Sequence, residues 1–153
     1  YAMEKQAESM LSKMSGRLEH YPALEQRLAQ HLDETKHQLT LLEQLLDSHG
    51  IDHSVMKDAM GKMAATGQAV GGMFNSDEVV KGAISGYVFE NAEIASYTSL
   101  IAAAEQVGDA QGVRILSEIR DQEVAMAELL QHLPEVTQQF LQRASQPGTE
   151  AKK

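Results

Sequence analysis

Four glutamates, one in each of four expected helices, are the residues of this sequence best suited to chemistry. They are Glu4, Glu34, Glu90 and Glu123. Each stands mid-helix, at a position of the apolar stripe where a leucine would be expected, and an ionised carboxylate there is costly unless it is paired or bound to a metal. Two have a second donor one turn further on, as Glu34-Thr-Lys-His37 and Glu90-Asn-Ala-Glu93. This pattern is typical of a two-metal carboxylate site inside a four-helix bundle.

The donor set indicates which metals the site would bind. Carboxylate oxygens with a single imidazole suit Fe or Mn better than Zn, which favours more nitrogen and sulfur ligands. We expect two divalent ions, bridged by Glu34 and Glu123. We expect Glu4 and His37 to bind one of the two ions, and Glu90 and Glu93 to bind the other.

Hydrophobic periodicity predicts the elements that position these residues. The expected long helices cover residues 1–18, 22–48, 78–107 and 110–133. A short helix over 54–69 is expected within the connection 51–77, and Pro134 is expected to stop the fourth helix before a last one over 135–144. Two tight hairpins joined by one long crossover predict an all-α, ferritin-like four-helix bundle. We expect one domain over 1–144 and a disordered polar tail over 145–153.

The spacing of the glutamates from the expected turns places them at one height in the bundle. Glu4 lies 14 residues before Leu18, and Glu34 lies 12 residues after Pro22. At about 1.5 Å per residue, both are roughly 18 to 21 Å from the turn between their helices. Glu93 and Glu123 lie at a similar distance from the second turn. The sequence therefore predicts that the carboxylates meet in the centre of the bundle.

Each of these residues also has an ordinary explanation. Glu123 could pair with Arg120 or Lys36, and Glu90 and Glu93 could form a solvated face of an acidic protein. His31 lies one turn before Glu34 on the same face, where we favour a satisfied core histidine over a residue that supports a ligand. Tyr87 and Tyr97 flank the third helix's carboxylates, and we interpret them as buried tyrosines with ordinary partners. The joint pattern still favours a metal site.

Composition excludes several classes of function. The chain has 153 residues, no cysteine and a net charge of −9. The missing thiols exclude disulfides, zinc–thiolate sites and thiol nucleophiles, and the negative charge disfavours a nucleic-acid partner. No apolar run reaches the roughly 20 residues needed to span a membrane. No leader sequence is visible, so we expect a cytoplasmic protein, with further residues before Tyr1 because the first helix starts there.

Stretches across nearly the whole chain resemble a known family. They are 2–10, 31–37, 76–82, 89–97 and 133–137. Together they are similar to the bacterial YciE/YciF-type ferritin-like proteins, and to the YciE branch in particular. The resemblance implies a ferritin-like bundle, usually dimeric, that is linked to general stress responses. The family's biochemical activity is not established, so the resemblance implies the fold rather than the reaction.

The expected ligands also resemble those of rubrerythrins, with two departures. Relatives often carry a histidine where this chain has Asn91. Rubrerythrin-like sites have a histidine one turn after the last glutamate, and this chain has Met126 and Ala127 there. We therefore expect the second metal to have few ligands, with weak binding or an open position.

These observations lead to one functional interpretation and two alternatives. The leading interpretation is a dinuclear Fe or Mn carboxylate protein of the stress response, an oxidoreductase acting on O2 or peroxide. It would need an external electron donor, because the chain has no cysteine cluster. The alternatives are a non-catalytic interaction bundle and iron storage. We expect a homodimer through 51–77 and the third helix, because the stretch 60–74 is too apolar for a free loop.

Overall fold

The computed structural model describes residues 1–14, 16, 18–51 and 78–148. Their elements are α1 (Ala2–Met14), α2 (Pro22–Ser48), α4 (Glu78–Val107), α5 (Ala110–Leu129), the 3-10 turn η1 (Leu130–His132) and α6 (Leu133–Ala144). No strand occurs within these described ranges, so the expected all-α class is confirmed. The short helix predicted over 54–69 and the end of the predicted tail, 149–153, lie outside the described residues.

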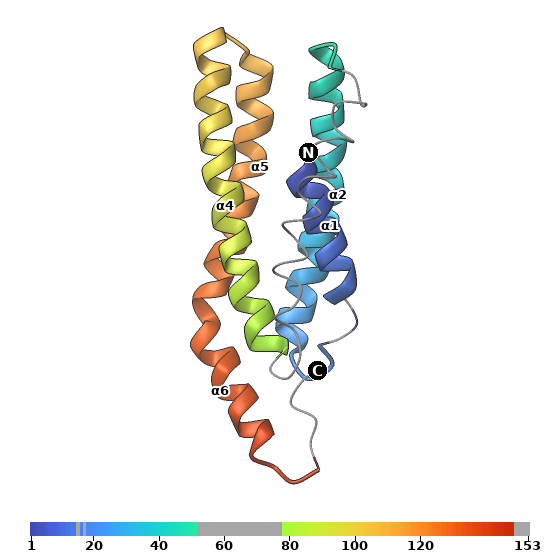
Figure 1. The fold of residues 1–153 in the computed structure, drawn as a ribbon, viewed down its shortest axis with the longest axis vertical. Helices are drawn as coiled ribbons and strands as arrows, with labels where there is room; N and C mark the ends of the chain where they lie inside the picture. The colour runs from blue at the N-terminus through green and yellow to red at the C-terminus, as the bar shows by residue number, and fades with distance from the viewer. Residues whose placement is uncertain (15, 17, 52–77, 149–153) are drawn as a thin grey trace.

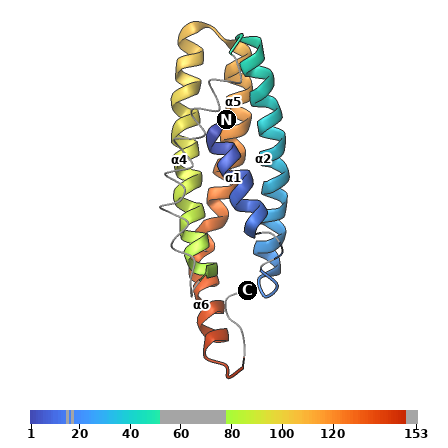
Figure 2. The same cartoon turned by 45° about the vertical axis from the view of Figure 1, so that its right-hand side comes forward.

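The four long helices run side by side as a bundle (Figures 1 and 2), with α1 packed on α2 and α4 packed on α5. At one end, His49 after α2 contacts Asp109 in the turn between α4 and α5, at 2.9 Å. At the other end, Val79 at the start of α4 packs in one apolar cluster with Leu18 and Tyr21. The residues between α2 and α4 therefore connect opposite ends of the bundle, as a single long crossover requires.

The first hairpin turns earlier than the sequence predicts. Helix α1 ends at Met14 rather than near Leu18, and Gly16 adopts a positive φ of 77°, which glycine tolerates without strain. The carboxylate of Glu25 on α2 accepts hydrogen bonds from the backbone N–H groups of Gly16 and Leu18. These two bonds satisfy backbone donors in the turn, so the helix gives way to a side-chain-stabilised loop.

Pro134 does not stop a helix. Helix α5 ends at Leu129, the 3-10 turn follows, and α6 begins at Leu133 with Pro134 in its first turn. A proline is tolerated there because the N–H that it lacks would have no partner inside the helix. Helix α6 extends beyond the end of the bundle (Figure 1) and packs against α4.

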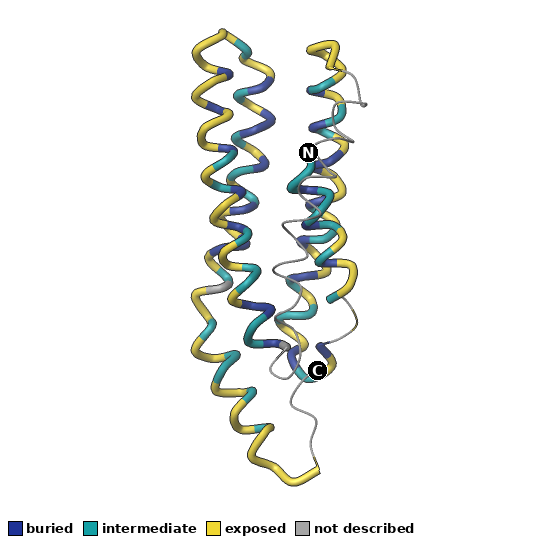
Figure 3. The backbone as a smooth tube through the Cα atoms, viewed as in Figure 1, coloured by how far each residue is buried: buried dark blue, intermediate teal, exposed yellow. Residues whose placement is uncertain are grey.

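Two apolar clusters fill the bundle, and polar residues separate them. The first cluster comprises Leu42, Leu45, Tyr97, Ile101, Ala104, Ile115, Leu116 and Ile119. The second comprises Leu11, Leu18, Tyr21, Leu28, Val79 and Met126. Along α2, α4 and α5, buried polar residues lie between the positions that belong to these clusters. Figure 3 shows the buried positions along the facing sides of the helices. The apolar clusters thus hold the helices together on both sides of a central polar layer.

Candidate metal centre

Seven buried polar side chains form a layer across the bundle, which we call the polar layer. They are Glu4, His31, Thr35, Gln38, Glu90, Glu93 and Glu123. Glu90 is the most exposed of them at 5%, and four of the seven side chains are carboxylates. All four long helices contribute, because each places between one and three of these residues between its apolar positions. The layer therefore concentrates negative charge in the driest part of the molecule.

The first half of the layer is the His31 group, which consists of His31, Glu90 and Glu123. The Nε2 atom of His31 lies 3.4 Å from Oε2 of Glu90 and 3.3 Å from Oε2 of Glu123. One donor atom from each of the three residues lies within 4.8 Å of the others. Helices α2, α4 and α5 thus aim one nitrogen and two carboxylates at a single point.

The second half is the Glu4 group, which consists of Glu4, Glu93 and Glu123. Again, one oxygen from each residue lies within 4.8 Å of the other two. The buried Tyr97 hydroxyl donates a hydrogen bond to Oε1 of Glu4. Glu123 belongs to both groups, so the two halves meet at its carboxylate.

Most donor atoms of the two groups lack a hydrogen-bond partner. Among the described residues, no hydrogen bond reaches these buried atoms of the groups: Glu4 Oε2, His31 Nε2, Glu90 Oε2, both oxygens of Glu93 and Glu123 Oε2. A buried polar group left unpaired costs free energy, so native structures rarely tolerate several in one place. Three of the six atoms, His31 Nε2, Glu90 Oε2 and Glu123 Oε2, form ion-pair contacts with one another instead. Glu4 Oε2 and both oxygens of Glu93 remain unpaired in the part of the chain that the structure describes, and a bound cation would satisfy them.

The pKa values of the carboxyls reflect the free-energy cost of burying their ionised forms. Burial raises the pKa of Glu4 to about 7, opposed by the hydrogen bond from Tyr97 and reinforced by the charge of Glu123. Burial also raises the pKa of Glu123 to about 7, although His31 lowers it. Burial and the charges of Glu4, Glu123 and Glu90 raise the pKa of Glu93 well above its usual range. Without a cation, these carboxyls therefore hold protons near neutral pH.

The histidine responds in the opposite way. Burial is the largest single influence on the pKa of His31 and lowers it, because a dry site disfavours the imidazolium. The contacts with Glu123 and Glu90 together outweigh burial and raise the pKa of His31 to about 11. His31 is therefore a cation that partly neutralises its half of the layer.

Two further members of the layer fix the orientation of the central residues. Gln38 donates hydrogen bonds to Oε1 of Glu123 at 2.6 Å and to Oε1 of Gln122 at 2.9 Å. Thr35 donates to the backbone carbonyl of His31 at 2.9 Å. The oxygen of Glu123 that Gln38 does not hold is the one that faces His31. Gln38 therefore holds Glu123 with one oxygen free for the His31 group.

Residues 1–142 match the family described as Domain of unknown function (DUF892). The chain belongs to the DUF892 family. A solved crystal structure of a protein from Xanthomonas campestris pv. campestris str. ATCC 33913 is also similar, with 34% sequence identity and a TM-score of 0.78. That match covers 95% of this chain and 91% of the Xanthomonas chain. The comparisons support a bundle of the ferritin-like type over nearly the whole DUF892 chain and name no reaction.

In this DUF892 bundle, four of the six ligands predicted from the sequence meet in the polar layer. They are Glu4, Glu90, Glu93 and Glu123. Neither of the ordinary partners considered for Glu123 is engaged with it, since Arg120 contacts Asp121 and Lys36 contacts Asp33. The convergence expected from the shared height is therefore present for these four carboxylates.

The structure does not bring the other two predicted residues into either group. The Glu34 side chain is 21% exposed, and it accepts hydrogen bonds from Arg27 at 3.0 Å and Gln30 at 2.8 Å. These donors and His31 lower the pKa of Glu34 despite partial burial, which acts to raise it. His37 is exposed. Metal binding by Glu34 and His37 stays a prediction, and the positions of their side chains give it no support.

Two central residues were missed as direct participants by the sequence interpretation. They are His31 and Gln38, which both lie on the buried face of α2, and His31 was interpreted as an ordinary core histidine. The buried positions of α2 run 28, 31, 35, 38, 42, which is the three- and four-residue spacing of one helix face. That spacing includes His31 and passes through Thr35 instead of Glu34. The series 28, 31, 34, 38, 42 has the same three- and four-residue spacing, so periodicity alone does not distinguish Thr35 from Glu34.

Glu34 instead lies directly behind the histidine. Its Oε2 atom lies 3.0 Å from Nδ1 of His31, the ring nitrogen on the opposite side from Glu90 and Glu123. A carboxylate on the far nitrogen of a metal-binding histidine is a common arrangement, because it orients the ring and raises its basicity. The chain Arg27–Glu34–His31 thus connects the polar layer to the surface of α2.

The donor set fits two divalent cations. Four buried carboxylates carry four negative charges when ionised, and two divalent ions carry four positive charges. Binding such ions, with His31 giving up its proton to serve as a ligand, would balance the layer and satisfy the unpaired oxygens at the same time. With one nitrogen and otherwise oxygen donors, the set suits Fe or Mn. The buried cluster of the DUF892 bundle is therefore a candidate metal centre.

Proposed function

We propose that this protein is a dinuclear metal protein that binds two Fe or Mn ions in the polar layer. One ion would be held by the His31 group and the other by the Glu4 group, with Glu123 shared between them. The observation that supports this most strongly is the convergence of buried donor atoms within 4.8 Å in both groups, with Glu4 Oε2 and both Glu93 oxygens unpaired among the described residues. In a protein without a ligand to bind there, selection for stability would favour apolar residues of similar volume.

The chemistry that such a pair of ions supplies when bound is the exchange of two electrons with O2 or peroxide. The residues of the chain exclude water from the site and orient the side chains that would bind the ions. The apolar clusters on both sides exclude water from the layer. Tyr97 holds Glu4, Gln38 holds Glu123, and Glu34 orients His31. We therefore propose an oxidoreductase that acts on O2 or peroxide. Its place in a stress response, and in the YciE branch, rests on the resemblance of the sequence.

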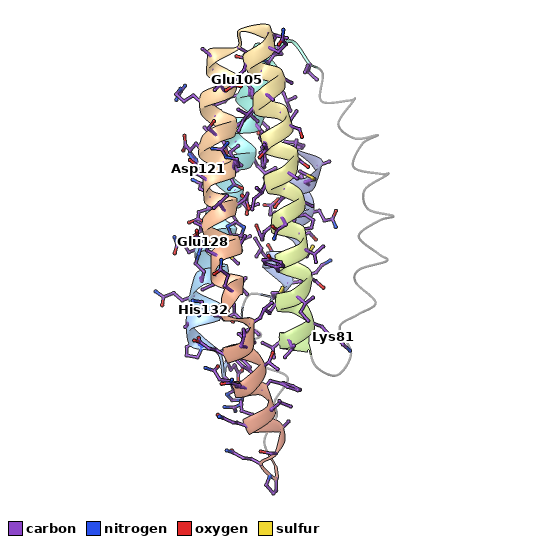
Figure 4. All side chains as sticks on the ribbon, turned by 90° about the vertical axis from the view of Figure 1, so that its left-hand side faces the viewer. Lys81, Glu105, Asp121, Glu128 and His132 are labelled. Carbon is purple, nitrogen blue, oxygen red and sulfur yellow. The ribbon has the colours of Figure 1, made fainter. Side chains whose placement is uncertain are left out.

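A second candidate, an interaction bundle, is favoured by the outer face of α4. Between Lys81 and Glu105, the only charged residues of α4 are Glu90 and Glu93, and both are buried. Figure 4 shows Lys81 and Glu105 near the two ends of this helix. The large exposed apolar side chains between Lys81 and Glu105 are Ile84, Tyr87, Val88 and Leu100. We propose that this face forms a homodimer interface, which sedimentation of a monomer at micromolar concentration would overturn.

Metal-dependent stability separates the two candidates. Protein stripped of metal is titrated with Mn(II), or with Fe(II) without oxygen, and its Tm and bound metal are measured. Two ions per chain and a rising Tm are expected, because a ligand that binds only the folded state stabilises it. The matched control is Glu128→Gln, an exposed carboxylate on the same helix as Glu123. An unchanged Tm and no bound metal in native protein would leave the interaction bundle as the better reading.

A further inference from the structure

A small cavity lies directly beside the His31 group. It measures about 30 Å³, and Glu90 is the only charged residue among those that line it. Its other walls come from all four long helices and include Met10, Met14, Leu28, Ala83, Phe89 and Met126. We propose that this cavity binds a small, uncharged, apolar molecule of the class of O2. The role of that molecule as a reactant rests on the proposed metal centre; the binding site itself does not.

The size of the cavity limits what it can hold. A water molecule needs about 10 to 15 Å³ of cavity volume, so this cavity has room for roughly two water-sized groups. A diatomic molecule fits this volume, whereas drug-sized ligands occupy pockets of about 300 Å³ or more. The cavity therefore suits a gas molecule rather than an organic substrate.

The polarity of the walls selects among small molecules. A buried water makes about two to four hydrogen bonds, and cavities that lack such partners stay dry and take up apolar guests such as xenon. This cavity offers one carboxylate and otherwise apolar side chains. Water and hydrogen peroxide, which both need several partners, are therefore disfavoured there, and O2 is favoured.

The position of the cavity gives the two halves of the polar layer different neighbours. Glu90 belongs to the His31 group and also lines the cavity. Leu28 lies one turn before His31 on α2, and Met126 lies one turn after Glu123 on α5, and both line it too. The Glu4 group contributes no carboxylate of its own to the lining and is closed by Tyr97. A molecule in the cavity would thus lie next to the His31 half.

The outer wall of the cavity suits the entry of a gas. Met10 and Met14 on α1 are only half-buried, so the cavity lies close beneath the surface. A methionine side chain is unbranched and has three rotatable bonds, so it changes shape at little cost. Two such side chains let a small molecule pass without unfolding of the bundle.

Xenon binding to metal-free protein tests the site directly. Methionine methyl groups labelled with 13C are observed by NMR while xenon pressure is raised. The signals of Met10, Met14 and Met126 are expected to shift, because these side chains line the cavity. Met3, which contacts Ser96 and does not line it, serves as an internal control. Unshifted signals from all three lining methionines would overturn the proposal.

A cavity-filling variant tests the role of the site. Ala83→Leu places three more carbon atoms at a lining position of α4, and the matched control is Ala29→Leu at an exposed position of α2. Ala83→Leu should lose the xenon shifts, and its Fe(II)-loaded form should react severalfold more slowly with O2. Its Fe(II) affinity and its rate with hydrogen peroxide should change little. If Ala83→Leu does not fold, Gly86→Ala adds a methyl group at another lining position.

The outcomes separate this proposal from the metal centre. Equal slowing with O2 and peroxide would show that the cavity does not select an apolar gas, and would overturn that assignment. Xenon binding that survives Ala83→Leu would place the guest elsewhere and overturn the site. Protein that binds xenon at the lining methionines but takes up no Fe(II) would retain the binding site and refute the metal centre.

Discussion

The two halves of the polar layer share Glu123 but compensate for their buried charge differently. In the His31 group, an imidazolium contacts two carboxylates, and its far nitrogen contacts Glu34, which is paired with Arg27. In the Glu4 group, all three donors are carboxylates, and Glu4 accepts a hydrogen bond from the neutral Tyr97. One half therefore holds a cation in contact with its carboxylates, whereas His31 contacts the other half only at the shared Glu123 and acts on Glu4 and Glu93 from further away. Each half should respond differently when it is altered.

The largest effect is expected from Glu123→Gln, because it alters the residue that both halves share. The amide keeps the shape but removes a negative charge and one oxygen donor, so the gain in Tm on adding Mn(II) should disappear. At a metal concentration of 100 Kd, that gain corresponds to about 2.7 kcal/mol per independent site. In metal-free protein, Glu123→Gln breaks the buried contact with His31 but also removes a like charge beside Glu4, Glu90 and Glu93, so its stability should change less than that of His31→Asn. Calorimetry with and without Mn(II) measures both effects.

The exposed Glu128→Gln variant on the same helix provides the comparison for that experiment. It should keep the full metal-dependent rise in Tm, since its side chain lies outside the layer. If Glu123→Gln and Glu128→Gln gained the same stability from Mn(II), Glu123 would not be a ligand and the shared-carboxylate geometry would be wrong.

The second prediction separates the halves by altering one residue from each. Both His31→Asn and Glu93→Gln should reduce bound metal from two ions to one, as counted by native mass spectrometry. Without metal, their effects on stability should have opposite signs. Loss of the His31 cation leaves Glu90 and Glu123 uncompensated, which costs about 3 kcal/mol for a broken buried pair. Glu93→Gln removes a buried carboxyl that must either hold a proton or repel Glu4 and Glu123, so denaturant midpoints measured above neutral pH should rise.

Destabilisation of the metal-free protein by both changes would contradict this comparison. It would mean that the contacts of the Glu93 side chain stabilise the metal-free fold, rather than destabilise it by repulsion from Glu4 and Glu123. Loss of both ions in either variant would show instead that the two groups bind metal only as a pair.

The third prediction concerns pH and follows from the raised pKa values of Glu4 and Glu123. Both carboxyls titrate near about 7 when folded and from 4.5 when unfolded, so between these values the folded chain binds more protons. The metal-free protein should therefore lose stability as pH rises from about 4.5 to about 7. His31, raised from 6.5 to about 11, acts in the same direction at higher pH. A loss of 1 kcal/mol lowers Tm by about 2 to 4 °C in a chain of this size.

Metal should reverse this trend, because ions bind deprotonated carboxylates and compete with protons. The difference in Tm between metal-bound and metal-free protein should accordingly grow from pH 5 to pH 8. A difference independent of pH would indicate that the carboxyls of the layer do not exchange protons for metal.

The fold was largely predictable because helix periodicity and turn residues are local signals. The expected bounds of α2 and α4 agree with the structure, and three- to four-residue spacing placed Glu4, Glu90, Glu93 and Glu123 inward. The errors lie where side chains act on the backbone. Glu25 caps the first turn and shortens α1, and the 3-10 turn moves the start of α6 to Leu133. These contacts depend on tertiary packing that the local sequence does not encode.

The candidate site was predictable in its carboxylates but not in its detail. Glu34 and His31 are one turn apart on α2, and a small rotation of the helix decides which of them enters the layer. Glu34 also has Arg27 seven residues before it as an outward partner. Periodicity alone did not resolve this choice, because both residues lie near the edge of one apolar stripe. The neighbouring helices settle it by placing Glu90 and Glu123 against the ring of His31.

The fourth prediction therefore tests Glu34 as a positioning residue for His31. Glu34→Gln keeps the size of the side chain but weakens its hydrogen bond to Nδ1 of His31. Metal affinity should fall about 10- to 100-fold, as expected for a residue behind a ligand. The loss should concern the ion of the His31 group only, with the other ion retained. Titrations monitored by native mass spectrometry measure the two steps separately.

Arg27→Gln provides a graded control, since Arg27 contacts Glu34 and lies further from the layer. Its effect on metal affinity should be smaller than that of Glu34→Gln. Complete loss of both ions in Glu34→Gln would instead support the original prediction that Glu34 bridges the two metals.

The smallest effect is expected far from both halves, at the turn between α4 and α5. Asp109 caps α5 by accepting a hydrogen bond from the N–H of Gly112 at 2.8 Å, and its other oxygen contacts His49 at 2.9 Å. A Cβ added at Gly112 would collide with the Asp109 carboxylate and displace it from the cap. Asp109→Ala should lower the stability of the protein through the lost cap. The metal-dependent rise in Tm should be unchanged, because the turn lies outside the polar layer.

The hydrogen bonds from Gly112 and His49 lower the pKa of Asp109 below 3.8, so the stabilisation by its carboxylate is present above that pH and is lost as pH falls. This acid loss is opposite in direction to the pH dependence of Glu4 and Glu123. Comparison of native protein and Asp109→Ala by denaturation at pH 2 and pH 6 should show a larger difference between them at pH 6. An equal difference at both pH values would mean that the carboxylate charge contributes nothing to the cap.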